Sequence, residues 1–276
     1  MPKVEEILRE DIDLIAQIPP RSPGLHLSTI LEYLDEMMDG PQYDKTIDAN
    51  TRARFAIGLA WEAYLSLGLS KAKGWSVGEI RHDHIIYTPD FYDGKTGEVI
   101  EVKATSRAAT RKGGEVMKPS SNRRWMWQVM AYMQAVAMTR HGSDHVSKTN
   151  DVGEDGLPIP NLQARFIVLH YHEFDRQPRP REWRLEFTHR EIADNWRMIQ
   201  NAAKAFCNVC GAREDVTHVI DGGRGVRACK KCVKAYEHCD SCDQYYAGSR
   251  SGFRHKHDDG EQCWYARTDG GNLNDK

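Results

Sequence analysis

The hydrophobic pattern of this chain predicts an α/β protein. Helices, in which apolar positions recur every three to four residues, are expected at about 50–68, 123–140 and 189–205. Strands, in which apolar and β-branched residues gather in short runs, are expected near 77–87, 98–104, 164–171 and 182–187. Because these strands and helices are interspersed, residues 50–206 are predicted to form one α/β unit.

Two further regions flank this unit. Residues 1–49 are expected to be a helical accessory segment, with amphipathic helices around 4–17 and 26–38 that the Pro/Gly-rich stretch 19–24 separates. Residues 207–276 contain little apolar periodicity and hold all seven cysteines. Within the α/β unit, the polar stretch 141–160 is rich in Gly, Asp and Pro and indicates a surface loop.

Charge is unevenly distributed although the net charge is only −2. Residues 1–50 carry a net charge of −7, residues 207–276 are neutral, and residues 51–206 therefore carry about +5. No run of about 18 apolar residues exists, so no membrane span or membrane partner is expected. The N-terminus lacks a secretory pattern, which together with the cysteine distribution predicts a protein of the reducing cytoplasm.

A short stretch in the middle of the chain combines acidic residues with a lysine. Residues 85–93 and 98–103 flank a turn that contains Gly94 and Gly97, which predicts a β-hairpin with Asp90 near the end of its first strand. On the second strand, Glu101 and Lys103 share one face because strand side chains alternate, while Val102 points to the other. Carboxylates bind hard divalent cations and an amine offsets phosphate charge, so the pattern suits phosphodiester hydrolysis. The alternative is a solvated, charged hairpin face.

Two helices add residues in the same order along the chain. Glu62 lies in a stretch that is apolar on nearly every side, where a carboxylate needs a cation or, alternatively, an arginine such as Arg54. Gln128 and Tyr132 lie four residues apart on one helical face, beside an apolar stripe that is expected to be buried. This stripe consists of Met126, Val129, Met130, Met133 and Ala137.

The set Glu62, Asp90, Glu101-x-Lys103 and Gln128-x-x-x-Tyr132 resembles the PD-(D/E)XK nucleases, and within them the RecB-like branch. The resemblance covers roughly residues 50–140. It implies a restriction-endonuclease-like core, in which helices flank a central mixed sheet, and a magnesium- or manganese-dependent nuclease.

The resemblance also implies roles for these residues. Asp90, Glu101 and the Val102 carbonyl would bind the catalytic metal, and Glu62 would hold the same or a second ion. Lys103 would position the attacking water, while Gln128 and Tyr132 would orient the nucleotide. Many RecB-like members have a histidine shortly before the first-helix glutamate, but Gly58, Leu59 and Ala60 occupy that region here. A site of oxygen ligands alone suits magnesium as well as manganese.

A basic segment follows the lysine strand and predicts contacts with DNA phosphates. Its six cationic residues are Arg107, Arg111, Lys112, Lys118, Arg123 and Arg124. Trp125 and Trp127 suit stacking on an unpaired base, although tryptophans at the start of a helix are more often core anchors. The stretch His170-Tyr171-His172-Glu173 lacks the spacing of a zinc peptidase and indicates a strand end.

The cysteines predict structural zinc. Cys207-x2-Cys210 and Cys229-x2-Cys232 are separated by 18 residues, which is typical of a zinc ribbon. A second site is predicted from Cys239, Cys242 and Cys263 with His257 as the favoured fourth ligand, and with His255 or His238 as alternatives. The pairs could instead interleave, as in cross-braced modules. Some RecB-like nucleases bind an iron–sulfur cluster through a cysteine before the core, but here no cysteine precedes Cys207.

The sequence leaves three functional hypotheses. The first is a DNA exonuclease, phage-encoded if judged by the resemblance and then located in the bacterial host cytoplasm. It would process DNA ends in recombination, repair or phage DNA metabolism. Recombination or replication proteins are expected partners through the zinc module or the N-terminal segment. The second hypothesis is a structure-specific or restriction-type endonuclease, and the third is a catalytically inactive, zinc-containing DNA-binding or assembly protein.

Overall fold

The computed structural model describes the chain in segments. The described residues are 22–40, 56–58, 60–61, 65, 76, 78–105, 118–141, 152–170, 180–220 and 226–234. Of residues 237–239, 244–246, 253–256 and 262–265 the backbone alone is described, as it is at 141, 217–220 and 226. The expected helix at 4–17 lies outside these residues.

The chain divides into two compact units. The first contains Met1–Ser22, Leu31–His82 and Ile86–Ile199, and the second contains Pro23–Ile30, Asp83–Ile85 and Gln200–Lys276. Each unit has its own four-stranded mixed sheet with helices against it, so the chain is α/β as predicted. Among the described residues, no helix has both the length and the apolar character needed to cross a membrane.

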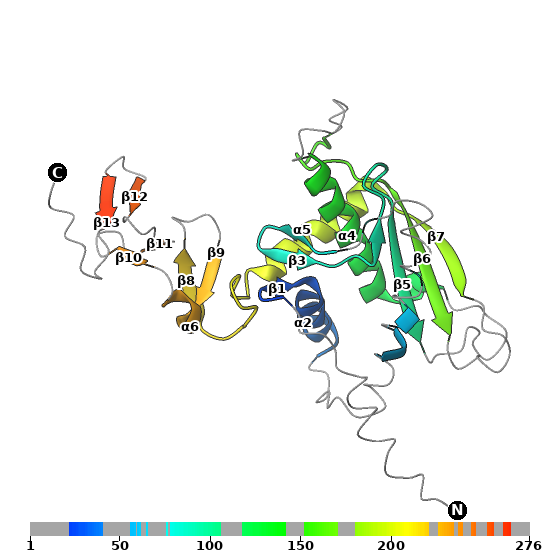
Figure 1. Ribbon diagram of the computed structural model, residues 1–276, viewed down its shortest axis with the longest axis horizontal. Helices are drawn as coiled ribbons and strands as arrows, with labels where there is room; N and C mark the ends of the chain where they lie inside the picture. Colours follow the sequence, from blue (N-terminus) through cyan, green and yellow to red (C-terminus); the bar gives the residue numbers. More distant parts are fainter. Residues whose placement is uncertain are drawn as a thin grey trace, which may run out of the picture. The chain divides into compact units, whose positions relative to one another are not determined.

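The sheet of the first unit has the strand order β4-β5-β6-β7; Figure 1 labels β5, β6 and β7 of this sheet. Its strands are β4 (Phe91–Tyr92), β5 (Val99–Thr105), β6 (Gln163–His170) and β7 (Arg181–Glu186). The inner pair β5 and β6 is parallel, and both outer pairs are antiparallel. The predicted hairpin before β5 is confirmed, and β6 ends at His170 as expected.

The first sheet is covered on both faces. Ile100 and Val102 of β5 form a buried cluster with Phe91 and Ile167, against which Trp61 and Leu65 pack. On the opposite face, Phe166 is the β6 partner of Glu101, and the Trp125 ring of α4 (Arg123–His141) lies 5.3 Å from the Phe166 ring. Residues paired in register point to the same face, so α4 lies over the face that carries Glu101.

Both long helices of the first unit begin with hydrogen bonds from capping residues. Asn122 caps α4, because its Oδ1 accepts a hydrogen bond from the Trp125 amide at 3.2 Å. Thr188 and Glu191 form a reciprocal capping box at the start of α5 (His189–Ala203). The amide and hydroxyl of Thr188 donate to the Glu191 carboxylate and lower its pKa. The central part of α4 is buried on several sides: Val129, Met133 and Ala137 are buried as predicted, whereas Met126 and Met130 are half-buried.

One expected strand is two strands. The run near 77–87 contains β2 (Ile80–His82) and β3 (Ile85–Tyr87), which belong to a three-stranded sheet of order β1-β3-β2 with β1 (Leu25–His26). The turn between them places Asp83 and His84 at φ values of 46° and 63°. Left-handed φ values at both central positions are typical of a tight hairpin turn. The prediction missed it because neither residue is the usual glycine. Helix α2 (Leu27–Asp39) lies where the second amphipathic helix was expected.

The second unit contains a sheet of order β10-β11-β8-β9 and a separate antiparallel pair, β12 and β13. Its elements are β8 (Val216–Ile220), β9 (Val226–Cys229), α6 (Lys230–Val233), β10 (Glu237–Cys239), β11 (Gln244–Tyr246), β12 (Phe253–Lys256) and β13 (Gln262–Tyr265). Helix α6 packs against β8 and β9. A short 3-10 helix, η1 (Pro119–Ser121), precedes α4 in the first unit.

Burial of β5 predicts a large difference between two isoleucine substitutions. Ile100 is fully buried, so Ile100→Ala should lower the free energy of unfolding by about 2–5 kcal/mol through lost burial and a cavity. Ile159 is 41% exposed, and Ile159→Ala should change the same quantity by less than about 0.5 kcal/mol. Urea unfolding followed by circular dichroism measures both. Equal effects would show that β5 is not a core strand.

Candidate functional site

The pairing of β4 with β5 brings Asp90 next to Glu101. Phe91 pairs with Ile100, so the preceding residue, Asp90, comes opposite the following one, Glu101. The Asp90 carboxylate accepts a hydrogen bond of 2.6 Å from the Val102 amide, and the neighbouring Glu101 side chain interacts with it. The predicted neighbourhood of these two acids is therefore present, although Asp90 precedes the first hairpin strand instead of ending it.

Lys103 completes this cluster. Its amine is hydrogen-bonded to the Glu101 carboxylate, and two residues along β5 separate them on the same face. The Glu101 side chain has no solvent exposure, whereas the Lys103 side chain is 23% exposed. Asp90, Glu101 and Lys103 thus form a carboxylate–lysine cluster that reaches from the interior to the surface, and the alternative of a solvated charged face does not hold for Glu101.

The electrostatics of the carboxylate–lysine cluster are dominated by burial. Burial raises the pKa of Asp90, because removal from water disfavours the charged carboxylate. The Lys103 ammonium and the Val102 amide act in the opposite direction but do not reverse the shift. Two acids here share one amine, so a further positive charge would stabilise their ionised forms. A hard divalent cation with oxygen ligands fits such a donor set.

The Val102 carbonyl lies on the side of the strand that faces Asp90. The N–H and C=O of one residue in an extended strand point the same way, and the Val102 N–H is directed at the Asp90 carboxylate. The family resemblance assigns this carbonyl to the catalytic metal, and that assignment stays a prediction.

Helix α4 carries the predicted Gln128 and Tyr132 pair. The Gln128 amide Nε2 donates to the Tyr132 hydroxyl at 2.8 Å, which fixes both side chains relative to each other. Tyr132 is buried and Gln128 is half-buried. Trp125 packs on Phe166, and the Arg123 guanidinium lies 5.0 Å from the Trp127 ring centre. Trp125 is therefore an anchor of the helix on the sheet.

Half of the predicted DNA-contacting residues are described. Lys118 is exposed. Arg123 forms ion pairs with Asp35 at 3.3 Å and Asp39 at 2.5 Å, and Arg124 lies 3.5 Å from both Asp35 and Glu32. Two of the predicted DNA-binding arginines therefore lie against the acidic face of α2, a contact that the sequence did not reveal. Glu62, Arg107, Arg111 and Lys112 lie outside the described residues.

The second unit brings together the first four cysteines. The Sγ atoms of Cys207, Cys210, Cys229 and Cys232 all lie within 4.8 Å of one another, and that of Cys210 is 3.8 Å from that of Cys229. A tetrahedral zinc ion with bonds of about 2.3 Å requires sulfur atoms about 3.8 Å apart. These four residues, called the four-cysteine cluster below, can therefore bind a metal such as zinc.

Local structure explains how the four-cysteine cluster forms. Cys207 and Cys210 lie in a tight turn in which the Gly211 amide donates to the Cys207 carbonyl at 2.8 Å. Gly211 has a φ of +74°, and an added Cβ would lie 3.0 Å from the Gly24 carbonyl oxygen, so glycine is required there. Cys229 ends β9 and Cys232 lies in α6, so a strand end and the helix that follows it present the second pair.

Backbone amides of α6 stabilise the Cys229 thiolate. The Cys232 amide and, to a smaller extent, the Lys231 amide lower the pKa of Cys229 to about 7. Burial raises the pKa of Cys210 and of Cys232. A bound metal favours the thiolate at all four positions, because thiolate is the form that ligates zinc.

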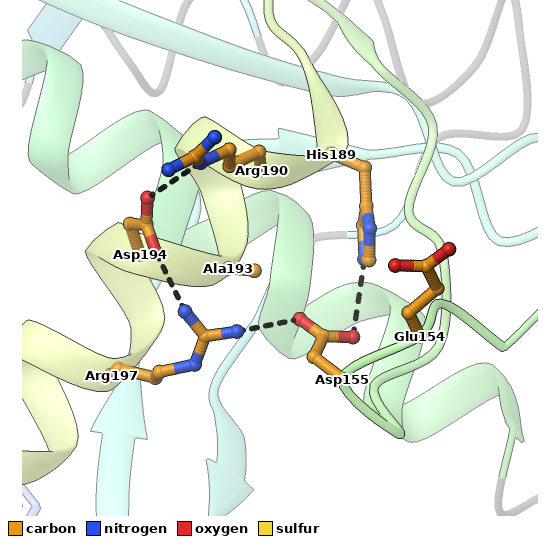
Figure 2. A pocket seen from close by; sticks show the side chains of 7 residues that line it. All are labelled: Glu154, Asp155, His189, Arg190, Ala193, Asp194 and Arg197. Carbon is orange, nitrogen blue, oxygen red and sulfur yellow. Dashed lines mark hydrogen bonds and ion pairs between the residues drawn. The ribbon is translucent and has the colours of Figure 1, made fainter.

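A cavity of about 540 Å³ lies elsewhere in the first unit (Figure 2). Its lining residues are Glu154, Asp155, His189, Arg190, Ala193, Asp194 and Arg197. Arg197 bridges Asp155 at 3.1 Å and Asp194 at 2.6 Å, which ties the turn at 153–156 to α5. None of the site residues predicted from the sequence lines this cavity. Its charged side chains form ion pairs that connect the turn to α5.

Comparisons with known proteins do not identify a family. No family model matches the chain, and no curated protein matches it. Among solved structures, one described as "Crystal structure of SSO0001" matches with a TM-score of 0.34 and 10% sequence identity, covering 70% of this chain and 81% of that chain. A TM-score this low does not establish a common fold.

The four-cysteine cluster predicts the effect of a single serine substitution. Cys229→Ser removes one of four thiolates, so we expect the purified protein to lose one zinc ion and the β8–β9 hairpin with α6 to unfold. Zinc released on denaturation and hydrogen exchange of residues 216–233 measure the two effects. Lys231→Ala, an exposed neighbour that offers no ligand, is the control and should keep the zinc. Full zinc retention by Cys229→Ser would contradict the assignment.

Proposed function

We propose that this protein is a divalent-metal-dependent deoxyribonuclease that hydrolyses phosphodiester bonds, acting as an exonuclease on DNA ends. The observation that carries the proposal is the convergence of Asp90, Glu101 and Lys103 at the junction of β4 and β5. The resemblance of the sequence to the PD-(D/E)XK nucleases supplies the reaction. The restriction-endonuclease-like core belongs to this proposal, as do the boundaries 1–49, 50–206 and 207–276.

The charge of the carboxylate–lysine cluster supports a cation site. With both acids ionised and Lys103 protonated, the cluster has a net charge of −1 in a place where Glu101 has no access to water. Burial makes ionised carboxylates costly, and a nearby positive charge offsets that cost. Magnesium or manganese, held by Asp90, Glu101 and the Val102 carbonyl, would remove that cost and suits ligands that are all oxygen. Bound there, the ion would lower the pKa of a water molecule and shield the phosphate.

Side chains of the protein would then position the attacking water, the phosphate and the nucleotide. The partly exposed Lys103 amine is positioned to hydrogen-bond the attacking water or a phosphate oxygen, and its charge offsets the negative charge that develops on the phosphate. The new bond joins the water oxygen to phosphorus while that water loses a proton to the solvent, the bond to the leaving sugar oxygen breaks, and that oxygen takes up a proton from the solvent. Gln128 and Tyr132, held by their mutual hydrogen bond, are the proposed contacts to the nucleotide.

Substitutions that each remove one charged group of the carboxylate–lysine cluster test the proposed catalysis. Glu101→Gln and Lys103→Ala should each lower the rate of DNA hydrolysis at least about 100-fold, because they remove a cation ligand and the phosphate-facing amine. Glu98→Gln is the matched control: Glu98 precedes β5 and pairs with Arg165 at 3.1 Å, so this variant should keep the wild-type rate. The assay follows end-labelled linear DNA in magnesium or manganese, with both single-stranded and double-stranded substrates.

A closed circular plasmid in the same assay distinguishes the two nuclease hypotheses. An exonuclease leaves the circle intact and degrades the linear DNA, whereas an endonuclease linearises the circle. Wild-type rates for both Glu101→Gln and Lys103→Ala would contradict the proposal, as would a wild-type protein that hydrolyses neither substrate with either metal.

A further inference from the structure

Two arginines at the start of α4 lie against the acidic face of α2. This face consists of Glu32, Asp35 and Asp39, whose spacing of three and then four residues places them on one side of the helix. Arg123 pairs with Asp35 at 3.3 Å and with Asp39 at 2.5 Å, while Arg124 lies 3.5 Å from Asp35 and from Glu32. All of these residues belong to the first unit. Asp35, with 14% of its side chain exposed, thus contacts both guanidinium groups.

Apolar packing is concentrated in the first part of α2. Leu31 and Leu34 are buried, whereas Met37 and Met38 are 64% and 54% exposed. The end of the helix is attached to α4 through ion pairs of partly exposed side chains, and such pairs contribute little to stability because water also solvates these charges. A segment that is attached in this way can open locally while the rest of the protein stays folded.

The start of α4 lies over the strand next to the carboxylate–lysine cluster. Trp125, which follows Arg124 directly, packs against Phe166 with ring centres 5.3 Å apart. Phe166 is the β6 partner of Glu101, so the first turn of α4 lies one strand away from the cluster on the same face of the sheet. DNA with one phosphate at the cluster would therefore present further phosphates to Arg123 and Arg124.

Carboxylates and phosphates compete for the same guanidinium groups. An arginine binds either anion through charge-assisted N–H···O hydrogen bonds, which can form in parallel pairs. The acidic face of α2 presents its carboxylates to Arg123 and Arg124 as a DNA backbone would present its phosphates. DNA also releases counterions when its phosphates are neutralised, which favours its binding. It can therefore displace an acidic segment that is weakly attached.

We propose that the acidic face of α2 forms an autoinhibitory contact, which occupies Arg123 and Arg124 in the protein without DNA and is displaced by DNA phosphates. The contact lowers the affinity for DNA, because each bound strand must first replace the carboxylates of α2. Since DNA is the ligand, this contact rests on the proposed function, but it does not require hydrolysis.

The test measures the DNA affinity of the full-length protein by fluorescence anisotropy, with labelled single-stranded and double-stranded oligonucleotides and no added magnesium or manganese. Asp35→Asn removes the carboxylate that both arginines share and should tighten binding about 2- to 10-fold, as expected for the loss of one or two exposed ion pairs. Asp39→Asn should act in the same direction. Asp194→Asn is the matched control, because Asp194 pairs with Arg197 at 2.6 Å in α5. It removes the same charge and also releases an arginine, but should keep the wild-type affinity.

A double-mutant cycle separates release of the arginines from a general change in charge. With Arg123→Gln and Arg124→Gln both present, DNA binding should be weaker than in the wild type, and Asp35→Asn should have no further effect. Hydrogen exchange of residues 35–39 should become faster when the wild-type protein binds DNA, because the ion pairs that attach them are broken. An unchanged affinity for Asp35→Asn, or an equal gain with and without the two arginines, would overturn the autoinhibitory contact.

The outcomes distinguish the autoinhibitory contact from the proposed nuclease. If Asp35→Asn tightens binding in the expected pattern but no DNA is hydrolysed, the contact is supported and the nuclease is contradicted. If DNA is hydrolysed through Glu101 and Lys103 but Asp35→Asn binds DNA as the wild type does, only the contact is contradicted. Failure of the wild type and of all variants to bind DNA would also overturn the contact.

Discussion

Two carboxyl groups and one amine lie together in the first unit because β4 and β5 pair in a single register. That register sets Asp90 against Glu101, and the alternation of side chains along β5 adds Lys103 on the same face. A slip of one residue would turn Glu101 to the face occupied by Ile100 and Val102. The apolar cluster on that face therefore determines where the acids lie, which links core packing directly to the proposed chemistry.

The two units offer different donor atoms. The first presents carboxylate oxygens and one ammonium, and a hard divalent cation is proposed there because such ions prefer oxygen ligands. The second presents thiolates, which suit zinc and a permanent structural role. Around the four-cysteine cluster, the buried core consists of Cys207, Ala228, Cys229 and Val233. A bound metal would stabilise the small buried core that the described residues of this unit form, whereas the first unit has buried strands and helices of its own.

Much of the first unit was predictable because its signals are local. The period of apolar residues gave α4, α5, β5 and β6 close to their observed bounds, and the alternation along β5 placed Glu101 and Lys103 correctly on one face. Contacts between distant segments were not predictable in this way. Arg123 and Arg124 both form ion pairs with Asp35, from which they are about ninety residues away in sequence. Nothing in the basic segment indicated an acidic partner in α2.

One incorrect prediction arose from local backbone geometry. The turn at Asp83 and His84 adopts left-handed φ values without glycine, so the run near 77–87 gave no sign of a break. The second predicted zinc site, with Cys239, Cys242, Cys263 and His257, has no described side chains and stays a prediction. The part of the prediction that concerns Glu62 and the first half of the basic segment lies outside the described residues.

Direct binding of manganese to the protein without DNA tests the central claim, because it requires neither turnover nor substrate. Titration calorimetry or the paramagnetic resonance of free Mn²⁺ measures it at neutral pH on zinc-loaded protein. The carboxylate–lysine cluster predicts a site that wild-type protein and Glu98→Gln share and that both Asp90→Asn and Glu101→Gln lose. Equal manganese binding by all four proteins would contradict a cation held between Asp90 and Glu101.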